Sequence, residues 1–577
     1  LIGLVGSEMC IRDSWNECPF KVTKGIKMLV SEAIRKGRKK IGVAADTPSL
    51  LANSVLQLWT NAVSDSASVP AFTCLGQTLS YGETDQLARR VATFFQKELK
   101  LKPGDRIAVQ LPNIIQYPVV VIAALKLGLI IVNVNPMYST REIVHQFNDA
   151  NVKTVVVLDQ FYETVKNAAP ETNIKNIIVT RPIDLLPSVK QQILTLAMKA
   201  LGKRPVIRDK NVIWFKTLLK SGASYSTYRS SIDDVFALQY TGGTTGVSKG
   251  VKLTQKSLLA NVAQCLDVIK INNDFLYCST TISPLPLYHI YAYALCFGIL
   301  PAIRGHSVLI PDPRNTASFV KVLKKNKFDI FCGLNSLFVS LLEYPEFKRI
   351  DFSKLKITLS GGMALMPAVA DQWAQVTGCQ ISEGYGMTEA SPVISMNPSG
   401  FQKIGSAGIP VAGTEVKVID ESGAFKAVDH EGELCIKGPQ MMDGYWNDEE
   451  KTSKTIIDGW LHTGDIVKVD KDGFITIVDR LKDMIIVSGF NVYPTELEQT
   501  LTSHPMIAQC AAIGVKDRKS GEVVKMFVVK SDESLTEKEV RDFCKENMAP
   551  YKVPKTIEFR ASLPMSNVGK VLRKELQ

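Results

Sequence analysis

The chain has 577 residues, 45% of them hydrophobic, so it has the apolar content for several packed cores rather than one. Its 68 Lys and Arg against 57 Asp and Glu give a net charge of +11, which favours anionic ligands such as nucleotides; the lack of a long basic block argues against nucleic acid. The 11 cysteines show no C-x-x-C or C-x-x-H spacing, which disfavours a zinc or disulfide framework and favours a reducing cytosol.

The first segments of the chain raise the question of targeting. Residues 1–14, "LIGLVGSEMCIRDS", have no basic segment before their apolar stretch and make a poor signal peptide. They resemble translated adapter sequence, and we expect a non-native extension. The apolar run at 117–136 is divided by Lys126 and Gly128, so both halves are short for a membrane span. We predict a buried helix followed by a buried strand.

Strand-like and helix-like segments alternate from about residue 70. A helix is predicted at 81–99, and buried strands at 106–112 and 154–159; a second such series includes 328–333 and 356–362. This alternation predicts βαβ units and mainly parallel sheets.

The pattern of predicted strands and helices then changes twice. Short β-like pieces with Gly and Asp turns predict a small β subdomain at about 404–480. The last hundred residues combine strands at 508–515 and 523–530 with a helix at 536–548, which predicts an α+β unit. We therefore expect a large N-terminal α/β domain over 15–480 and a smaller domain over 481–577.

A basic segment at 185–208 interrupts the first α/β series. It contains five cations and no acid, and Ile193, Leu194, Ala197 and Leu201 fall at helical spacing. Two interpretations stay open: the segment lies on an anionic membrane, or it is an inserted helix docked on the core with a basic face in water. The cations are Lys190, Lys199, Lys203, Arg204 and Arg208.

The loop "YTGGTTGVSKG" at 240–250 has the composition of a phosphate-binding turn. Its glycines let the backbone approach an anion, its hydroxyls can donate hydrogen bonds, and Lys249 adds charge. The Walker A spacing G-x-x-x-x-G-K-[ST] fails, because Lys249 lies between Ser248 and Gly250. The loop thus predicts phosphate binding of another kind, through Thr241, Gly242, Gly243, Thr244, Thr245, Gly246 and Lys249.

Six further motifs follow this loop in a fixed order. The series resembles the adenylate-forming superfamily of acyl-CoA synthetases, luciferases and peptide-synthetase adenylation domains, from about residue 50 onwards. Stretches such as "VNVNPMYSTRE" and "VSGFNVYPTELE" are most similar to bacterial long-chain-fatty-acid–CoA ligases. The motifs are "PLPLYHIYA" (284–292), "LSGGMAL" (359–365), "EGYGMTEAS" (383–391), "DGWLHTGD" (458–465), "VDRLKDMIIVSGFNVYP" (478–494) and "PMSNVGKVLRKEL" (564–576).

The resemblance implies an AMP-binding domain over 15–480 and a mobile domain over 481–577. It also implies that the Gly-rich loop holds the β- and γ-phosphates of ATP, that Glu389 binds Mg²⁺, and that Asp465 accepts the ribose hydroxyls with help from Arg480. Carboxylates are the oxygen ligands that Mg²⁺ prefers. The remaining nucleotide contacts expected are Gly361, Gly362, Tyr385 against adenine, Gly386, Met387, and Thr388 at the α-phosphate.

Other residues are assigned to the reaction in the same way. Lys570 is expected to reach the α-phosphate and carboxylate oxygens, and His289 to line the acyl entrance. Lys482 matches the hinge about which the small domain rotates between the two half-reactions. Ser488, Gly489 and Phe490 are expected to guide CoA.

The implied activity is ATP-dependent formation of acyl-AMP from a medium- to long-chain fatty acid, followed by thioester formation with CoA. Two alternatives stay open: a fatty-acyl-AMP ligase that serves a carrier protein, and a non-catalytic membrane-associated fatty-acid binding or uptake protein. An ATPase or kinase is disfavoured by the Walker A failure. We expect a cytoplasmic location with peripheral contact at the inner face of an anionic membrane. We expect no nucleic-acid partner, and a homodimer is left as an open alternative.

Overall fold

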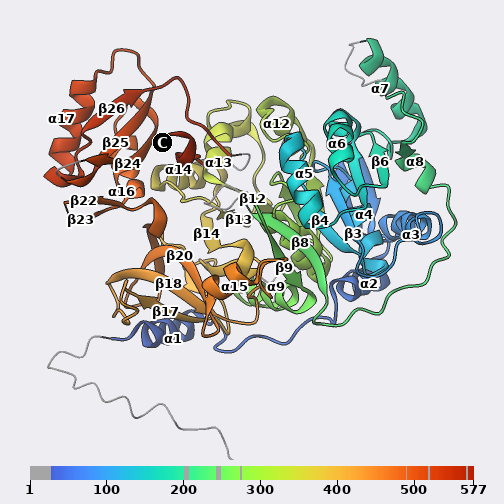
Figure 1. Cartoon of the computed structure of the whole chain (residues 1–577), viewed down its shortest axis with the longest axis horizontal. Helices are drawn as coiled ribbons and strands as arrows, with labels where there is room; N and C mark the ends of the chain where they lie inside the picture. Colours follow the sequence, from blue (N-terminus) through green and yellow to red (C-terminus); the bar gives the residue numbers. More distant parts are fainter. Residues whose placement is uncertain are drawn as a thin grey trace, which may run out of the picture.

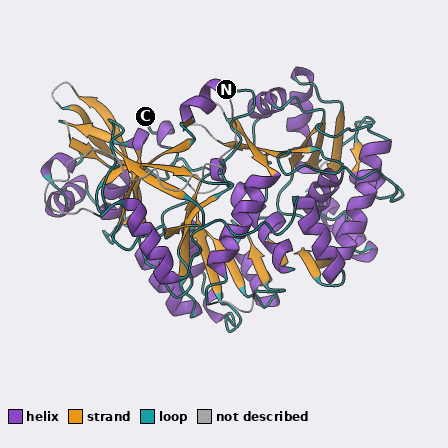
Figure 2. Ribbon diagram, turned by 90° about the horizontal axis from the view of Figure 1, so that it is seen from below, coloured by secondary structure: helices purple, strands orange, loops and turns teal. Residues whose placement is uncertain are grey.

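The computed structural model describes residues 28–200, 207–241, 248–272, 276–488, 490–517, 520–566 and 570–577. Within these residues the strands form four sheets, of nine, seven, five and five strands. The two large sheets lie side by side in the centre and right of Figure 1, and the two small sheets lie to the left. Figure 2 shows helices lying against the strands of the large sheets.

The seven-stranded sheet is built from the first α/β series. All its neighbouring strands are parallel except the last pair, β8 and β9. Every residue of β4 and β5 is buried, as expected for a sheet covered on both faces. In spatial order its strands are β7 (Ile213–Trp214), β6 (Asn176–Thr180), β5 (Thr154–Leu158), β3 (Arg106–Gln110), β4 (Ile130–Asn133), β8 (Val235–Thr241) and β9 (Lys249–Thr254).

The nine-stranded sheet has a parallel centre with antiparallel strands at both edges. Together the two sheets confirm the prediction of mainly parallel α/β structure. In spatial order the strands are β16 (Ile409–Pro410), β15 (Val393–Met396), β14 (Ile381–Gly386), β13 (Ile357–Gly361), β12 (Ile330–Gly333), β10 (Thr280–Ser283), β11 (His306–Leu309), β1 (Pro70–Cys74) and β2 (Gln77–Ser80).

The two five-stranded sheets follow in the chain. The first is antiparallel throughout, and in the second β26 pairs in parallel with β25. The first contains β17 (Glu415–Ile419), β18 (Glu431–Lys437), β19 (Ile456–Ile457), β20 (Trp460–Val469) and β21 (Ile475–Arg480); the second contains β22 (Ile485–Val487), β23 (Phe490–Val492), β24 (Ile507–Asp517), β25 (Gly521–Lys530) and β26 (Thr556–Phe559).

Helices begin where the sequence supplies caps. Ser80 and Glu83 form a reciprocal capping box at the start of α3, and Thr536 and Glu539 do the same for α17. The helices are α1 (Val30–Ile41), α2 (Val55–Ser66), α3 (Tyr81–Lys97), α4 (Gln116–Lys126), α5 (Thr140–Asp149), α6 (Tyr162–Ala168), α7 (Ser188–Ala200), α8 (Phe215–Leu218), α9 (Gln255–Ile269), α10 (Ile290–Ala294), α11 (Leu300–Ile303), α12 (Thr316–Lys325), α13 (Asn335–Leu342), α14 (Pro367–Thr377), α15 (Glu449–Thr455), α16 (Pro494–Thr502) and α17 (Glu537–Asn547).

The apolar run at 117–136 forms α4 and β4, which confirms the predicted helix and strand. Every residue of α4 is buried, including Lys126, whose ammonium lies 2.6 Å from the Asp85 carboxylate. A buried charge needs such a partner. Among the described residues, none of the helices has both the length and the apolar character to cross a bilayer.

The basic segment forms α7, which projects from the molecule at the upper right of Figure 1. Val189, Ile193 and Leu196 are 71%, 61% and 68% exposed. Ile193, one of the residues at helical spacing, therefore does not dock on the core, whereas Leu194 beside it is partly buried. Residues 201–206 of this segment lie outside the described residues, as do residues 1–14.

Candidate active site

Asp465 is the best-defined member of the site. It lies on β20, is 2% exposed, and accepts a hydrogen bond from the Tyr385 hydroxyl of β14. The Arg480 guanidinium at the end of β21 lies 2.6 Å from its other carboxylate oxygen. Burial raises the pKa of Asp465, although the Arg480 charge opposes the shift. The structure thus brings three of the predicted nucleotide residues together from separate strands.

Lys570 reaches this group from the far end of the chain. The Lys570 charge acts on both Asp465 and His289, which precedes α10. Desolvation by surrounding protein atoms lowers the pKa of Lys570, and the Arg480 cation adds to the effect, although part of the side chain is open to solvent. Burial lowers the pKa of His289 to about 4, with a further contribution from Lys570. His289 is therefore neutral near pH 7.

Glu389 lies in a short 3-10 turn after β14 and is 8% exposed, as is Thr388. The Tyr445 hydroxyl donates a 2.8 Å hydrogen bond to one Glu389 oxygen. The Lys249 ammonium lies 5.0 Å from the centroid of the same tyrosine ring. A carboxylate oriented by one hydroxyl keeps a second oxygen for a hard cation, so Glu389 fits the oxygen chemistry of Mg²⁺.

The glycines of the predicted site lie where a side chain would clash with its neighbours or where the backbone has a positive φ angle. A Cβ on Gly386 would lie 1.9 Å from the Pro392 carbonyl oxygen, so no larger residue fits. Gly362 has φ +83°, a conformation that favours glycine. Gly361 is buried at the end of β13, where a Cβ would meet Tyr291 at 3.3 Å. Met387 is partly buried, and its N–H donates to the Pro392 carbonyl.

The Gly-rich loop joins β8 to β9. Thr241 and Lys249 face each other as the last pair of these antiparallel strands. The imidazole Nε2 of His145 lies 2.9 Å from the Ser248 carbonyl oxygen, which connects α5 to the loop's end. Gly242, Gly243, Thr244, Thr245 and Gly246 lie outside the described residues.

The predicted hinge and CoA residues lie in the segment that follows β21, and the Lys482 charge interacts with Asp465 and Arg480. Lys482 is in the 3-10 turn between β21 and β22, 3.9 Å from Asp483, and burial lowers its pKa. Ser488 lies in the β22–β23 turn, and Phe490 is 56% exposed and stacks on Tyr551. Gly489 lies outside the described residues.

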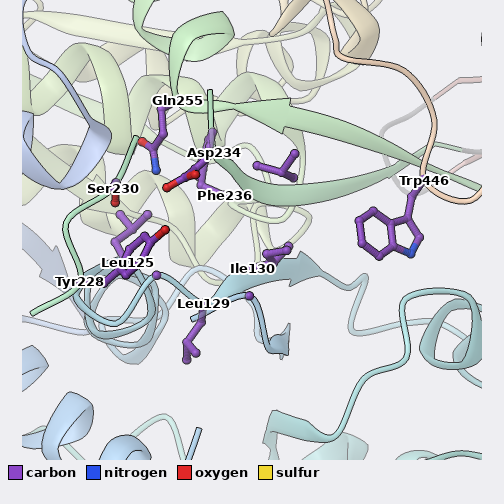
Figure 3. Close-up of a pocket in the computed structure, with 12 residues that line it drawn as sticks. Leu125, Leu129, Ile130, Tyr228, Ser230, Asp234, Phe236, Gln255 and Trp446 are labelled. Carbon is purple, nitrogen blue, oxygen red and sulfur yellow. The ribbon is translucent and has the colours of Figure 1, made fainter. Parts of the chain in front are cut away.

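A cavity of about 290 Å³ lies elsewhere, at the opposite end of β8 from the Gly-rich loop. Figure 3 shows its mostly apolar lining, which includes Leu125, Ile130 and Phe236, together with the polar side chains of Asp234 and Gln255. None of the residues that line it is among the predicted site residues. The cavity is therefore separate from the group around Asp465.

The sequence patterns did not predict several residues that contact the predicted site residues or their neighbours. Tyr445 was not recognised, although it contacts Glu389 directly. Glu433 and His462 were also missed, although His462 lies inside the quoted motif "DGWLHTGD". With Cys435 they form the one group of three His, Cys, Asp or Glu side chains among the described residues whose donor atoms lie close enough to share a metal ion. Only the pairing of β18 with β20 brings them together: Cys435 pairs with His462, and Glu433 lies two residues from Cys435 on the same strand.

Comparison with known proteins gives a consistent result. The pattern of the AMP-binding enzyme family matches residues 59–446, and that of the AMP-binding enzyme C-terminal domain matches residues 496–570. The chain is 41% identical over 530 residues to a long-chain-fatty-acid–CoA ligase of Salmonella typhimurium, covering 91% of this chain and 94% of that protein.

Solved structures share the fold over most of the chain. A structure of an anthranilate CoA ligase in complex with anthranoyl-AMP has a TM-score of 0.80 at 24% identity and covers 92% of this chain and 97% of that one. The O-succinylbenzoate coenzyme A synthetase of Bacillus subtilis, in complex with ATP and magnesium ion, has a TM-score of 0.74 at 25% identity, covering 90% and 98%. These comparisons confirm the expected fold of a large α/β domain followed by a small one.

Proposed function

This chain belongs to the AMP-binding enzyme family, and from that premise we propose that it is a long-chain-fatty-acid–CoA ligase. It activates a medium- to long-chain fatty acid with ATP and then transfers the acyl group to CoA, giving acyl-CoA, AMP and pyrophosphate. The 41% identity to a ligase of that name supports the fatty-acid substrate. The observation that carries the proposal is the buried Asp465 carboxylate, held by the Tyr385 hydroxyl and by the Arg480 guanidinium at 2.6 Å.

In the first half-reaction a carboxylate oxygen of the fatty acid attacks the α-phosphorus of ATP, and the bond to the pyrophosphate group breaks. Asp465 accepts the ribose hydroxyls and so fixes the nucleotide. The Lys570 ammonium and the Thr388 hydroxyl neutralise negative charge that develops on the α-phosphate oxygens. Mg²⁺ neutralises the phosphates when bound, and Glu389 is the residue that would hold it.

In the second half-reaction the CoA thiolate attacks the acyl carbonyl, and AMP leaves with the electrons of the acyl–oxygen bond. We assign Lys482 as the pivot of a rotation that withdraws Lys570 and brings Ser488, Gly489 and Phe490 towards CoA. Such a rotation lets one site serve two reactions and keeps water from a hydrolysable intermediate. The exposure of Phe490 supports this assignment, because the part of its ring that does not stack on Tyr551 is open to a new partner.

Two measurements test the proposal. Fatty-acid-dependent exchange between ATP and pyrophosphate should occur, and a thioester should form when CoA is added. Acyl-AMP that accumulates without thioester would instead identify a fatty-acyl-AMP ligase serving a carrier protein. Fatty-acid binding without any exchange would identify a non-catalytic binding protein. A panel of acids from acetate to oleate sets the chain-length preference.

We also propose that α7 makes peripheral contact with an anionic membrane at the cytoplasmic face. Its exposed Val189, Ile193 and Leu196 recur at helical spacing, and the surrounding segment carries cations and no acid. Vesicles of phosphatidylglycerol should sediment the protein, and deletion of 185–208 should abolish this. Equal sedimentation of the deletion variant would exclude the segment. Light scattering of the protein without vesicles tests for a homodimer.

A further inference from the structure

We infer that Glu433 and His462 form a positioning pair that sets the backbone around Asp465 for ribose recognition. Neither residue is assigned to contact the nucleotide, and nothing in the family comparison assigns them a role. The inference rests on the proposed function, because it takes Asp465 as the ribose acceptor.

The pair lies where the pairing of two strands is interrupted. Glu433 of β18 pairs with Ile466 of β20, and Cys435 pairs with His462. One β18 residue therefore opposes three residues of β20, which form a bulge over 463–465. Bulges next to active sites change the direction of a side chain. This bulge ends at Asp465, whose carboxylate points to Tyr385 and Arg480.

Three side-chain hydrogen bonds hold the bulge. The Thr463 hydroxyl donates to the Leu434 carbonyl at 2.8 Å and accepts from the Asp465 N–H at 3.1 Å. The Gly464 N–H donates to a Glu433 carboxylate oxygen at 3.1 Å. Gly464 has φ +67°, so its backbone lies in a region that needs glycine and benefits from an external restraint.

His462 restrains Glu433 in turn. Its ring Nδ1 lies 3.1 Å from the second Glu433 oxygen, and the two side chains are only 19% and 17% exposed. One carboxylate thus connects the residue at the start of the bulge with the glycine next to Asp465. Without this carboxylate the Gly464 N–H loses its acceptor, and the backbone before Asp465 can relax.

The consequence is specific to the nucleotide. The Asp465 carboxylate is already fixed at both oxygens by groups from β14 and β21, so a shift of its backbone would strain or break those contacts. A displacement of about 1 Å is enough to cost roughly a hundredfold in a positioned reaction. His289, the residue expected to line the acyl entrance, precedes α10 and is not part of β18 or β20, so the KM for the fatty acid should not change.

A bound metal ion is the competing explanation for the same cluster, since Glu433, Cys435 and His462 hold their donor atoms within 4.8 Å of one another. However, burial raises the pKa of the Cys435 thiol to about 12, and thiolate is the form that binds metal. The Cys435 sulfur already lies 3.5 Å from His462 Nδ1. We therefore assign the cluster to positioning and use Cys435→Ser to separate the two explanations.

The experiment compares ATP with 2′-deoxy-ATP in fatty-acid-dependent pyrophosphate exchange. The wild-type protein should prefer ATP in kcat/KM. Glu433→Ala should lose about tenfold of that preference while the KM for the fatty acid stays constant. Glu433→Gln should retain most of it, because its amide oxygen still accepts from Gly464. The preference of His462→Gln for ATP should lie between those of the two Glu433 variants. This variant replaces Glu433→Ala in the test if Glu433→Ala does not fold.

The controls separate the inference from the proposed function. Asp465→Ala should lose the preference for ATP completely. If it does, and Glu433→Ala and His462→Gln keep the wild-type preference, the positioning pair is overturned. If Asp465→Ala keeps the preference, the ribose role of Asp465 is wrong and the inference falls with it. A metal ion bound in equimolar amount by the wild-type protein and lost in Cys435→Ser would replace the pair by a metal cluster.

Discussion

The Tyr445 hydroxyl donates a 2.8 Å hydrogen bond to the Glu389 carboxylate, and the Lys249 ammonium lies over the ring of the same tyrosine. Tyr445 therefore joins the two elements assigned to ATP phosphates and magnesium. The contact pairs residues that are 56 positions apart in the chain. Its value to the enzyme is that it fixes one oxygen of a carboxylate that must present the other to a cation.

Tyr445→Phe should raise the Mg²⁺ concentration needed for half-maximal pyrophosphate exchange by about tenfold, which is the lower end of the loss expected for a residue that orients a metal ligand. The KM for the fatty acid should not change. Titration of exchange activity with MgCl₂ measures this. Tyr277→Phe, at a tyrosine that is 59% exposed, is the matched control. An unchanged magnesium requirement in Tyr445→Phe would show that Glu389 needs no help from this hydroxyl.

Lys570→Ala should reduce fatty-acid-dependent pyrophosphate exchange by about a hundredfold or more, because it removes a charge aimed at the reacting phosphate. Transfer of an acyl group to CoA from supplied acyl-AMP should persist, since the proposed rotation withdraws Lys570 before that step. The two half-reactions are assayed separately on the same preparation. Lys574→Ala, an exposed lysine of the same terminal segment, is the control. Equal loss of activity in both half-reactions would contradict the assignment of Lys570 to the first half-reaction alone.

Burial raises the pKa of Glu383 to about 7, against the backbone N–H of Leu365, which donates to its carboxylate. The folded protein therefore binds this proton more tightly than the unfolded chain. Protonated Glu383 contributes to the free energy of unfolding below about pH 5, and this contribution is lost as the pH rises through 7.

Glu383→Gln keeps an acceptor for Leu365 and cannot ionise. Its free energy of unfolding should match the wild type near pH 4 and exceed it by about 3 kcal/mol at pH 8. Urea unfolding at both pH values measures the difference. A difference that does not change with pH would mean that Glu383 titrates normally.

The ion pair between Lys126 and Asp85 is almost completely buried, with both side chains 6% exposed. Asp85→Ala would leave the Lys126 charge without its partner and should lower the free energy of unfolding by about 3–5 kcal/mol. Asp351→Ala, at an exposed pair with Lys327, should cost less than about 1 kcal/mol. Thermal unfolding compares the two. Similar small losses in both variants would show that Lys126 is neutral or hydrated in the native state.

Much of the fold followed from local patterns in the sequence. Alternating apolar and helical segments predicted β3, β5, α3 and the strands of the second α/β series, because periodicity records which face of each element is buried. The division of 117–136 by Lys126 and Gly128 predicted α4 and β4 for the same reason. The ordered motifs predicted the family, since their residue types carry nucleotide chemistry at fixed spacing.

Tertiary structure decided which distant residues meet and which faces stay open. Ile193 of α7 has the helical spacing of a packed residue, yet it lies in solvent because none of the elements that the structure describes covers it. Lys570 acts on Asp465, and Glu433 restrains Gly464, only because separate strands and the terminal segment pack against one another. By itself the sequence determined the elements and their chemistry, since these depend on neighbouring residues. The contacts that position Asp465 and Glu389 depend on packing between elements, which no local pattern encodes.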